Sequence, residues 1–240
     1  MELSIIIPTL NEEHYLPLLL KSIKKQTFTD YEIIVADAGS QDKTVTIAQS
    51  FGGRLTKGGL PAQGRNEGAK IARGNLFLFT DADNIFTSPN FLYDLIKQFR
   101  ERNLGSASFL IYSDGNRLDK ILYLFYNLWV KLTQNLLPHA TNSVLVRRDI
   151  HQKIGGFDEK IKIAEDQEYV RRAVRYGKFG FIEVDPVLNS CRRYRAQGRI
   201  KTYLKYFLSG MVMFFSGPIK SDIFKYRFDY QKVLKKNNNK

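Results

Sequence analysis

Three short apolar runs in the first hundred residues, separated by segments of helix-forming composition, limit the fold of this chain more than any other feature. The runs cover residues 3–7, 32–36 and 76–80 and lack the polar alternation of a half-exposed strand. Strands that are buried on both faces have this character. Their alternation with helices predicts βαβ units, and hence an α/β fold with a mostly parallel sheet flanked by helices.

Polar residues after each run predict where the helices begin. Asn11, Ser40 and Ser88 are expected to cap them, with Pro89 in the first helical position of the third. Further along the chain we expect strands at residues 106–112 and 142–146, and helices at residues 117–137 and 166–176.

Composition restricts the partners of the chain. Its 37 basic and 24 acidic residues give a net charge of +13, which predicts an anionic partner such as nucleic acid, a phosphorylated substrate or anionic lipid. Residues 218–240 hold seven lysines and arginines against two aspartates, a net charge of +5. The single cysteine, Cys191, cannot form an intramolecular disulfide, which predicts a reducing, cytoplasmic setting.

The strongest single motif is the apolar run at residues 76–80, which ends in two carboxylates, Asp81 and Asp83. Right-handed crossovers bring the carboxyl ends of parallel strands to one edge of the sheet, where open α/β folds bind ligands. Carboxylate oxygens are ligands that Mg²⁺ and Mn²⁺ prefer, and such a cation can bridge a diphosphate. We interpret the pair as a metal site, with solvated or helix-capping aspartates as the alternative.

Two further side chains belong to the same expected edge. Asp37 follows the second run, where a carboxylate can accept hydrogen bonds from a ribose or a base; capping of the next turn is its alternative role. Arg65 lies in a loop that runs into a helix, residues 58–69, where amides and a guanidinium can hold phosphate oxygens. An ordinary surface arginine is the alternative there.

Four motifs occur together in an order and spacing that resemble those of family 2 glycosyltransferases: Pro8-Thr9-Leu10-Asn11-Glu12, Asp37-Ala38-Gly39-Ser40, Gly64-Arg65-Asn66-Glu67-Gly68-Ala69 and Asp81-Ala82-Asp83. The resemblance covers about residues 3–195 and is specific as a combination. It implies the Rossmann-like GT-A fold over residues 1–199, with a nucleotide-sugar-binding half at 1–104 and an acceptor and catalytic-base half at 105–199.

Two later segments extend the resemblance. Gly155-Gly156-Phe157-Asp158-Glu159 with Glu165-Asp166 is similar to the family motifs that contain the general base, which implies this role for Asp166. Arg192 and Arg193 stand where relatives carry an arginine that contacts the donor diphosphate, although the sequence departs from the Q-x-x-R-W form of processive members. The alternatives are helix-start chemistry for Asp166 and general basicity for the arginines, and either arginine fits the diphosphate role.

The resemblance implies an inverting hexosyl transfer from a nucleotide-diphosphate sugar, with uridine diphosphate as the family expectation, to an acceptor hydroxyl. Mn²⁺ or Mg²⁺ on Asp83 and Asp81 would stabilise the departing diphosphate. The implied substrate-binding residues are Pro8, Thr9, Glu12, Asp37, Arg65, Asp81, Arg192 and Arg193.

Two amphipathic segments predict contact with a membrane. Residues 118–137 place lysine and amide side chains on one side of a helix and a wide apolar arc on the other, and residues 203–215 repeat this pattern. The apolar stretch at 206–219 is too short to span a bilayer. With the basic tail, residues 200–240 predict a peripheral or monotopic enzyme on the cytoplasmic face of an anionic membrane, whose acceptor is a polyprenyl-phosphate-linked sugar. Packing of these helices against the domain is the alternative.

Two other classes of protein fit part of the pattern. A nucleotidyltransferase would share the layered fold and the metal aspartates, but we would expect a glycine-rich phosphate loop after the first strand, where this chain has Pro8-Thr9-Leu10-Asn11. A basic nucleic-acid-binding module would carry its charge along one groove-fitting face, whereas here the charge gathers near the tail. We therefore expect no nucleic-acid partner.

Overall fold

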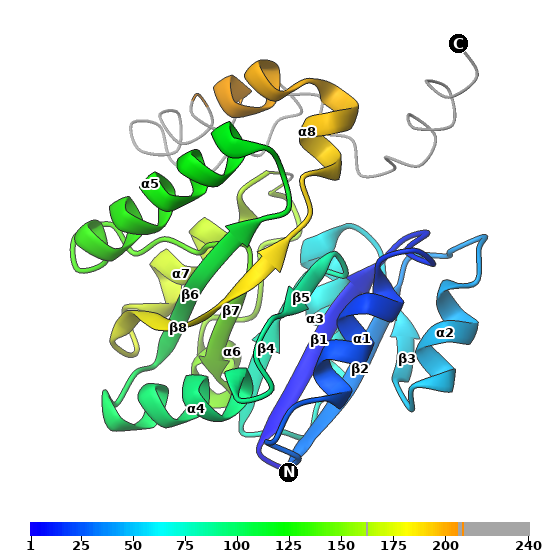
Figure 1. Ribbon diagram of the computed structural model, residues 1–240. Helices are drawn as coiled ribbons and strands as arrows, with labels where there is room; N and C mark the ends of the chain where they lie inside the picture. Colours follow the sequence, from blue (N-terminus) through cyan, green and yellow to red (C-terminus); the bar gives the residue numbers. More distant parts are fainter. Residues whose placement is uncertain (162, 206–207, 209–240) are drawn as a thin grey trace.

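The computed structural model describes residues 1–161, 163–205 and 208, and places a mixed sheet at the centre with helices on both faces (Figure 1). The strands lie in the order β3-β2-β1-β4-β7-β6-β8-β5. They are β1 (Leu3–Thr9), β2 (Tyr31–Asp37), β3 (Arg54–Lys57), β4 (Leu76–Phe79), β5 (Asn84–Phe86), β6 (Ser106–Ser113), β7 (Val144–Arg147) and β8 (Phe179–Asn189). The helices are α1 (Leu16–Lys24), α2 (Thr44–Ser50), α3 (Pro61–Ile71), α4 (Phe91–Glu101), α5 (Arg117–Thr133), α6 (Arg148–Lys153), α7 (Glu165–Ala173) and α8 (Arg192–Gln197).

The first half of the chain confirms the predicted βαβ organisation. β1 pairs in parallel with β2 and with β4, and β2 pairs in parallel with β3. Alternate residues of β1 enter two separate cores: Leu3 and Ile5 pack with α1 and α4, whereas Ile6 packs with α3, α6 and α7. Burial on both faces explains why the run shows no polar alternation.

The helix α3 lies unusually close to the sheet. A Cβ added to Gly68 would come within 2.4 Å of Cγ2 of Ile6, and one added to Gly64 would come within 3.0 Å of Cβ of Pro8. Only glycine permits this approach without displacing the strand. Both glycines of the third motif therefore serve helix packing, and Pro8 contributes to the same contact.

The predicted starts of the first two helices are wrong. α1 begins at Leu16 and α2 at Thr44, and neither has a side-chain cap. Asn11 instead adopts a left-handed φ of 56° and its side chain accepts a hydrogen bond from the Gln41 N–H (2.8 Å). The Ser40 hydroxyl accepts one from the Asn11 N–H (2.8 Å). These hydrogen bonds connect the loop after β1 to the loop after β2. Because Asn11 and Ser40 are used in this way, they do not cap α1 and α2.

The third predicted helix start is also wrong. α4 begins at Phe91, after Asn90, so Ser88 and Pro89 both precede it. The Ser88 carbonyl accepts a hydrogen bond from the Gln26 amide (2.8 Å). This hydrogen bond holds Ser88 beside the residues that follow α1. The helix α4 begins only after this contact.

The second half of the sheet is more mixed than predicted. β7 runs antiparallel to β4 and β6, β6 pairs in parallel with β8, and β5 is antiparallel to β8. β8 was not predicted, because Glu183 and Pro186 interrupt its apolar sequence. The register of its pairing with β6 shifts between Phe109 and Ile111, so the extra residues of β8 form an irregularity in the ladder.

The chain after α8 is helical over residues 199–205. The helix predicted at 203–215, the apolar stretch at 206–219 and the basic tail at 218–240 lie outside the described residues, except for 203–205 and 208. Across the part of the chain that is described, no helix combines the length and the apolar character needed to cross a membrane.

Candidate active site

The carboxyl ends of β1, β2 and β4 meet at one edge of the sheet, as the predicted topology requires (Figure 1). β1 ends at Thr9, β2 ends at Asp37, and β4 ends just before Asp81 and Asp83. The two carboxylates lie in a turn that a hydrogen bond from the Asn84 N–H to the Asp81 carbonyl closes (3.2 Å). The sequence motifs therefore converge in space.

Arg192 is the centre of a first group of charges at this edge, which we call the Arg192 cluster (Glu12, Asp83 and Arg192). Its Nη1 and Nη2 donate to the two carboxylate oxygens of Glu12, both at 2.6 Å, and its Nε lies 3.0 Å from Oδ2 of Asp83. The guanidinium carbon lies 4.5 Å from the centre of the Tyr15 ring. A guanidinium binds a carboxylate best through two parallel hydrogen bonds, and it also stacks well on the face of an aromatic ring. The charge of Arg193 acts on Asp83 more weakly than that of Arg192.

The carboxylates of this cluster are crowded. Burial raises the pKa of Glu12 to about 7, although the hydrogen bond and the charge of Arg192 oppose the shift. Burial and the charge of Asp81 also raise the pKa of Asp83, and Arg192 again opposes this. Buried carboxylates close to one another are stabilised by any cation between them. The site is therefore built around a positive charge.

Arg65 is the centre of a second group, which we call the Arg65 cluster (Arg65, Asp81 and Glu165). Its side chain is almost fully buried; Nη2 donates to Oδ1 of Asp81 (2.8 Å) and Nη1 pairs with Glu165 of α7. Its guanidinium carbon lies 5.3 Å from the centre of the Phe157 ring. Arg65 lies in the second turn of α3, whereas the sequence placed it near the start of the helix. It joins the turn that carries Asp81 to α7, and its contact with a nucleotide stays a prediction.

Asp166, the predicted base, is the second residue of α7. Burial and the neighbouring charge of Glu165 raise the pKa of Asp166 to about 7, while Arg65 opposes the shift. A carboxylate with such a pKa exchanges protons near neutral pH, as a general base must. Ala164, just before the helix, has a left-handed φ of 57°, and strained backbone of this kind is common at functional sites.

Asp37 binds its own chain. Its carboxylate accepts hydrogen bonds from the Thr9 hydroxyl (3.1 Å), the Gly39 N–H (3.0 Å), and both the N–H (2.8 Å) and the hydroxyl (2.5 Å) of Ser40. A carboxylate has about four acceptor positions. The capping role offered as an alternative is thus present, and a nucleotide contact of Asp37 or Thr9 stays a prediction.

Three residues of the site were given no role from the sequence: Tyr15, Glu165 and Asn66. The Asn66 amide oxygen accepts from the Phe157 N–H (2.8 Å), and its nitrogen donates to the Phe157 carbonyl (2.9 Å). The Phe157 ring stacks on Tyr169 of α7, with 3.9 Å between the ring centres. Asn66 therefore ties α3 to the helix that carries Asp166. In the sequence, the position of Asn66 next to Arg65 in the same motif was the feature that could have indicated this role.

A buried polar network supports the turn that carries Asp83. Asn84 is fully buried; its amide donates to the Thr80 hydroxyl (2.9 Å) and accepts from the Asn189 amide (2.9 Å). Asn189 in turn accepts from the Tyr123 hydroxyl of α5 (2.7 Å). Fully paired networks of this kind rigidify their surroundings. The turn that carries Asp83 is thereby connected to β8 and α5.

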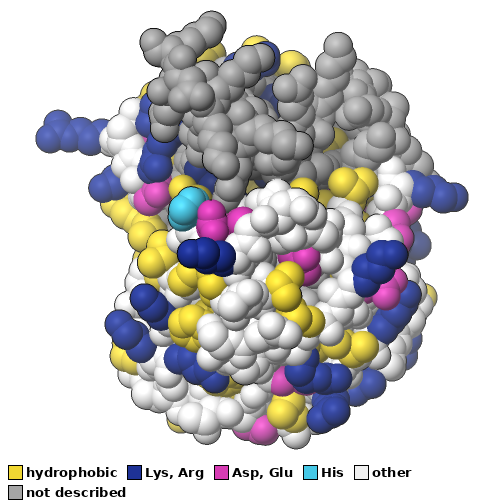
Figure 2. Space-filling view, turned by 90° about the vertical axis from the view of Figure 1, so that its right-hand side faces the viewer, with side chains coloured by type: hydrophobic (Ala, Val, Ile, Leu, Met, Phe, Trp, Pro, Cys, Tyr) yellow, Lys and Arg dark blue, Asp and Glu magenta, His cyan; other side chains and the backbone are white. Residues whose placement is uncertain are grey.

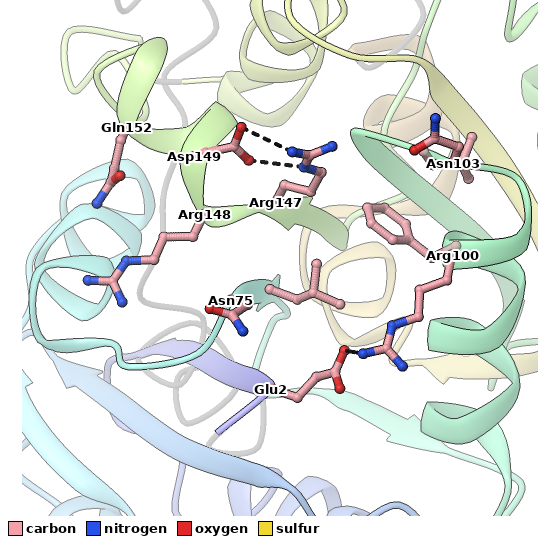
Figure 3. Close-up of a pocket in the computed structure, with 11 residues that line it drawn as sticks. Glu2, Asn75, Arg100, Asn103, Arg147, Arg148, Asp149 and Gln152 are labelled. Atoms are coloured by element: carbon pink, nitrogen blue, oxygen red, sulfur yellow. Dashed lines mark hydrogen bonds and ion pairs between the residues drawn. The ribbon is translucent and has the colours of Figure 1, made fainter.

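A hollow of about 620 Å³ opens at the opposite edge of the sheet, at the amino ends of β1 and β4. Figure 3 shows Arg100 directed at Glu2 and Arg147 directed at Asp149, and both pairs are ion pairs. The residues that line this hollow include none of those predicted for the site. The residues predicted for the site thus lie at the other edge of the sheet.

Charge on the face over α2 and β3 is dispersed. Figure 2 shows lysine and arginine side chains distributed among acidic and uncharged ones on this side of the molecule. A nucleic-acid-binding module is expected to line one face with basic residues. This face does not have that character.

Sequence comparison gives the family of the chain. The model of the family described as glycosyl transferase family 2 matches residues 4–157. A PGL/p-HBAD biosynthesis glycosyltransferase of Mycobacterium bovis is 43% identical over 184 residues, which cover 69% of this chain and 67% of the relative. The poly(ribitol-phosphate) beta-N-acetylglucosaminyltransferase TarS of Staphylococcus aureus is 37% identical over 94 residues, or 35% of this chain. The match spans only 16% of the length of TarS.

Solved structures share the fold. TarS residues 1–349 in complex with UDP-GlcNAc superpose with a TM-score of 0.66 at 20% identity, covering 89% of this chain and 67% of that one. The mannosyltransferase PcManGT from Pyrobaculum calidifontis, in complex with GDP-Man and Mn²⁺, superposes with a TM-score of 0.69 at 16% identity, covering 99% and 79%. Because the family model covers more than half of the residues, this chain belongs to glycosyl transferase family 2, and it has the GT-A fold.

Proposed function

We propose that this glycosyltransferase moves a sugar from a nucleotide-diphosphate sugar to an acceptor hydroxyl, with inversion and with Asp166 as the general base. The observation that supports this most is the convergence of the Arg192 cluster and the Arg65 cluster at one sheet edge. In the first cluster, the guanidinium of Arg192 supplies a positive charge of the kind that a departing diphosphate needs. The other lies against Asp166, whose pKa suits proton removal.

The residues present fit a divalent cation, Mn²⁺ or Mg²⁺, held by Asp83 and Asp81. Carboxylates are the hard oxygen ligands that these ions prefer, and the raised pKa of Asp83 reflects burial and a nearby negative charge. Among residues 1–161, 163–205 and 208, no group of three histidine, cysteine or acidic side chains forms a complete metal cage. One or two carboxylates together with substrate phosphates are a usual way to bind Mg²⁺. When bound, such a cation would neutralise charge on the diphosphate.

The side chains of this protein would divide the reaction between them. Asp166 accepts the proton of the acceptor hydroxyl, whose oxygen attacks the anomeric carbon as the bond from that carbon to the diphosphate oxygen breaks. Arg192, in contact with Asp83, stabilises the negative charge that develops on the departing diphosphate. Arg65 holds Glu165 beside Asp166, and the negative charge of Glu165 helps to raise the pKa of the base.

UDP sugars are the donors we expect first, supported by the shared fold of the TarS complex with UDP-GlcNAc, and the GDP-Man complex of PcManGT makes guanosine diphosphate sugars the second choice. For the acceptor we propose a polyprenyl-phosphate-linked sugar at the cytoplasmic face of a membrane. The amphipathic sequence of residues 118–137 and the basic tail support this choice.

A donor panel tests the proposal. Full-length protein would be mixed with UDP, GDP and dTDP sugars in the presence of Mn²⁺ or Mg²⁺, while Tm and the slow hydrolysis of each donor are measured. We expect one donor class to raise Tm and to be hydrolysed. Asp149→Asn, at an exposed ion pair in the opposite hollow, should behave as the wild type does. If no donor raises Tm with either metal, the proposed reaction is wrong.

A further inference from the structure

The helix α5 is attached to the domain by the side that carries Asp119, Tyr123, Asn127 and Val130. Asn127 is buried, and its amide accepts from the Ile111 N–H (3.2 Å) and donates to the Ile111 carbonyl (2.8 Å), which fixes the helix to β6. Asp119, fully buried, accepts from the Tyr203 hydroxyl (2.9 Å) and pairs with Arg199 (3.0 Å). Hydrogen bonds of Asn127 and Asp119 therefore hold this side of the helix in place, beside the buried side chains of Tyr123 and Val130.

The opposite side of α5 and its extension is apolar and exposed. Eight large apolar side chains there have between 42% and 87% of their surface accessible. They are Leu118, Ile121, Leu124, Phe125, Leu128, Trp129, Leu132 and Leu136, and we call them the α5 apolar face. Contiguous exposed apolar surface of this kind marks an interaction site, because water solvates it poorly. Within the described part of the chain, these side chains do not pack into the domain, and contact with a membrane stays a proposal.

The neighbouring helical segment adds to this surface. Residues 199–205 are bound beside α5 through the contacts of Arg199 and Tyr203 with Asp119, and Ile200 and Leu204 in this segment are exposed by 83% and 54%. Basic side chains stand among them: Arg117 and Lys201 are exposed, and Lys131 pairs with Glu183 near the end of α5. The result is apolar surface with basic residues at its borders.

We propose that the α5 apolar face rests in the interface of an anionic lipid bilayer. The charge of the chain favours lipid over a second copy as the occupant, because two chains of +13 repel each other whereas anionic headgroups attract them. At 1.5 Å per residue the 17-residue α5 is shorter than the roughly 30 Å of a hydrocarbon core, so it lies along the surface. Helices with an apolar face and basic borders bind membranes in this way.

The docked face is connected to the reaction site. Tyr123, on the buried side of α5, donates to Asn189, which donates to Asn84 beside Asp83. A membrane bound at α5 thus lies one helix away from the turn that carries the metal carboxylates. Docking itself does not depend on the proposed reaction, whereas its use, the delivery of a lipid-linked acceptor, rests on that proposal.

Trp129 allows a direct test, because it is the single tryptophan of the chain and belongs to the α5 apolar face. Full-length protein would be mixed with vesicles of phosphatidylcholine, with and without phosphatidylglycerol, and no donor would be added. With the anionic vesicles we expect the fluorescence emission of Trp129 to move to shorter wavelength and to be quenched by brominated lipid. Vesicle binding without any change in Trp129 emission would place the anchor elsewhere, for example in the tail, and would overturn the proposal.

A pair of variants gives the second measurement. Phe125→Glu with Leu128→Glu should lower the vesicle-bound fraction in flotation by about tenfold or more, since both side chains would leave the apolar interface. Leu18→Glu with Tyr93→Glu, at exposed apolar residues of α1 and α4, is the matched control and should float as the wild type does. Because the α5 side chains are exposed, Tm should not fall in either variant.

Three outcomes contradict the inference. A fall in Tm for the α5 variant would mean that its own chain covers this face. A dimer of the wild type in light scattering that the α5 variant abolishes would make a second copy the occupant. Equal flotation of the wild type and the α5 variant would exclude the face from membrane binding. None of these readouts needs a donor, so they stay separate from any failure of the proposed reaction.

Discussion

Arg192 forms an ion pair with Asp83, with 3.0 Å between Nε and Oδ2, and so places a side-chain cation on the carboxylate proposed to bind a metal. The same guanidinium binds both oxygens of Glu12. A divalent cation that binds Asp83 must therefore share this carboxylate with Arg192 or displace it. The diphosphate of a donor would offer Arg192 a new anionic partner, and the proposed binding of metal and donor would then be coupled.

The first prediction concerns this competition. Arg192→Gln removes the side-chain cation from Asp83, so Mn²⁺ should bind more tightly than to the wild type in the absence of donor, as measured by calorimetry. Transfer should nevertheless fall on the order of a hundredfold, because the departing diphosphate loses a charged partner. Arg195→Gln, in the same helix but paired with Asp114, is the control. Weaker Mn²⁺ binding in Arg192→Gln would show that the arginine does not compete.

The second prediction concerns Asp83, the proposed metal ligand. Asp83→Asn keeps the size of the side chain but removes its charge, so donor binding should no longer depend on Mn²⁺ or Mg²⁺ and transfer should fall by at least about a hundredfold. Excess chelator should do the same to the wild type, and added metal should reverse it. Circular dichroism would confirm that the variant is folded. Full activity in chelator would exclude a metal-dependent reaction.

The sheet edge was predictable because it depends on local pattern and on handedness. Apolar runs gave β1, β2 and β4, and right-handed crossovers placed Thr9, Asp37 and Asp81 at one edge. β8 could not be found in this way, because its apolar pattern is broken and pairing with β6 and β5 forms the strand. A strand that forms because of its tertiary pairing cannot be predicted from the local sequence pattern alone.

Side-chain partners were less predictable than positions. Glu165 and Arg65 are 100 residues apart, and no spacing rule connects them. The choice between Arg192 and Arg193 depends on the direction in which α8 leaves Cys191, which is a property of the packed chain. The orientation of α5 could not be predicted for a similar reason. An amphipathic pattern defines two faces of a helix, but tertiary contacts such as that of Asn127 with Ile111 determine which face is buried.

The third prediction concerns stability. Arg65→Met removes a buried cation and leaves Glu165 and Asp81 without their shared partner, which should lower the free energy of unfolding by about 3–5 kcal/mol. Arg147→Met, at an exposed pair with Asp149, should lower it by only about 0–1 kcal/mol. Urea denaturation at pH 8 measures both. Equal effects in the two variants would mean that Arg65 is a surface arginine in solution.

The last prediction concerns pH. Burial and Glu165 raise the pKa of Asp166 to about 7, and the base works only when it is deprotonated. The kcat/KM of the wild type should therefore be constant above this pKa and fall about tenfold per pH unit below it, because kcat/KM reports groups of the free enzyme. Asp166→Asn should lower turnover by about 10²–10⁴-fold, remove this pH dependence and leave donor affinity within a few fold.

Glu12 complicates this profile, because burial raises its pKa to about 7 as well. Glu12→Gln separates the two groups: it weakens donor binding through the loss of the Arg192 contact, but the acid limb of kcat/KM should remain, since Asp166 still titrates. Rates measured from pH 5 to pH 9 on both variants would decide between them. An acid limb that disappears in Glu12→Gln and persists in Asp166→Asn would reassign the titrating group to Glu12 and leave Asp166 without the role of base.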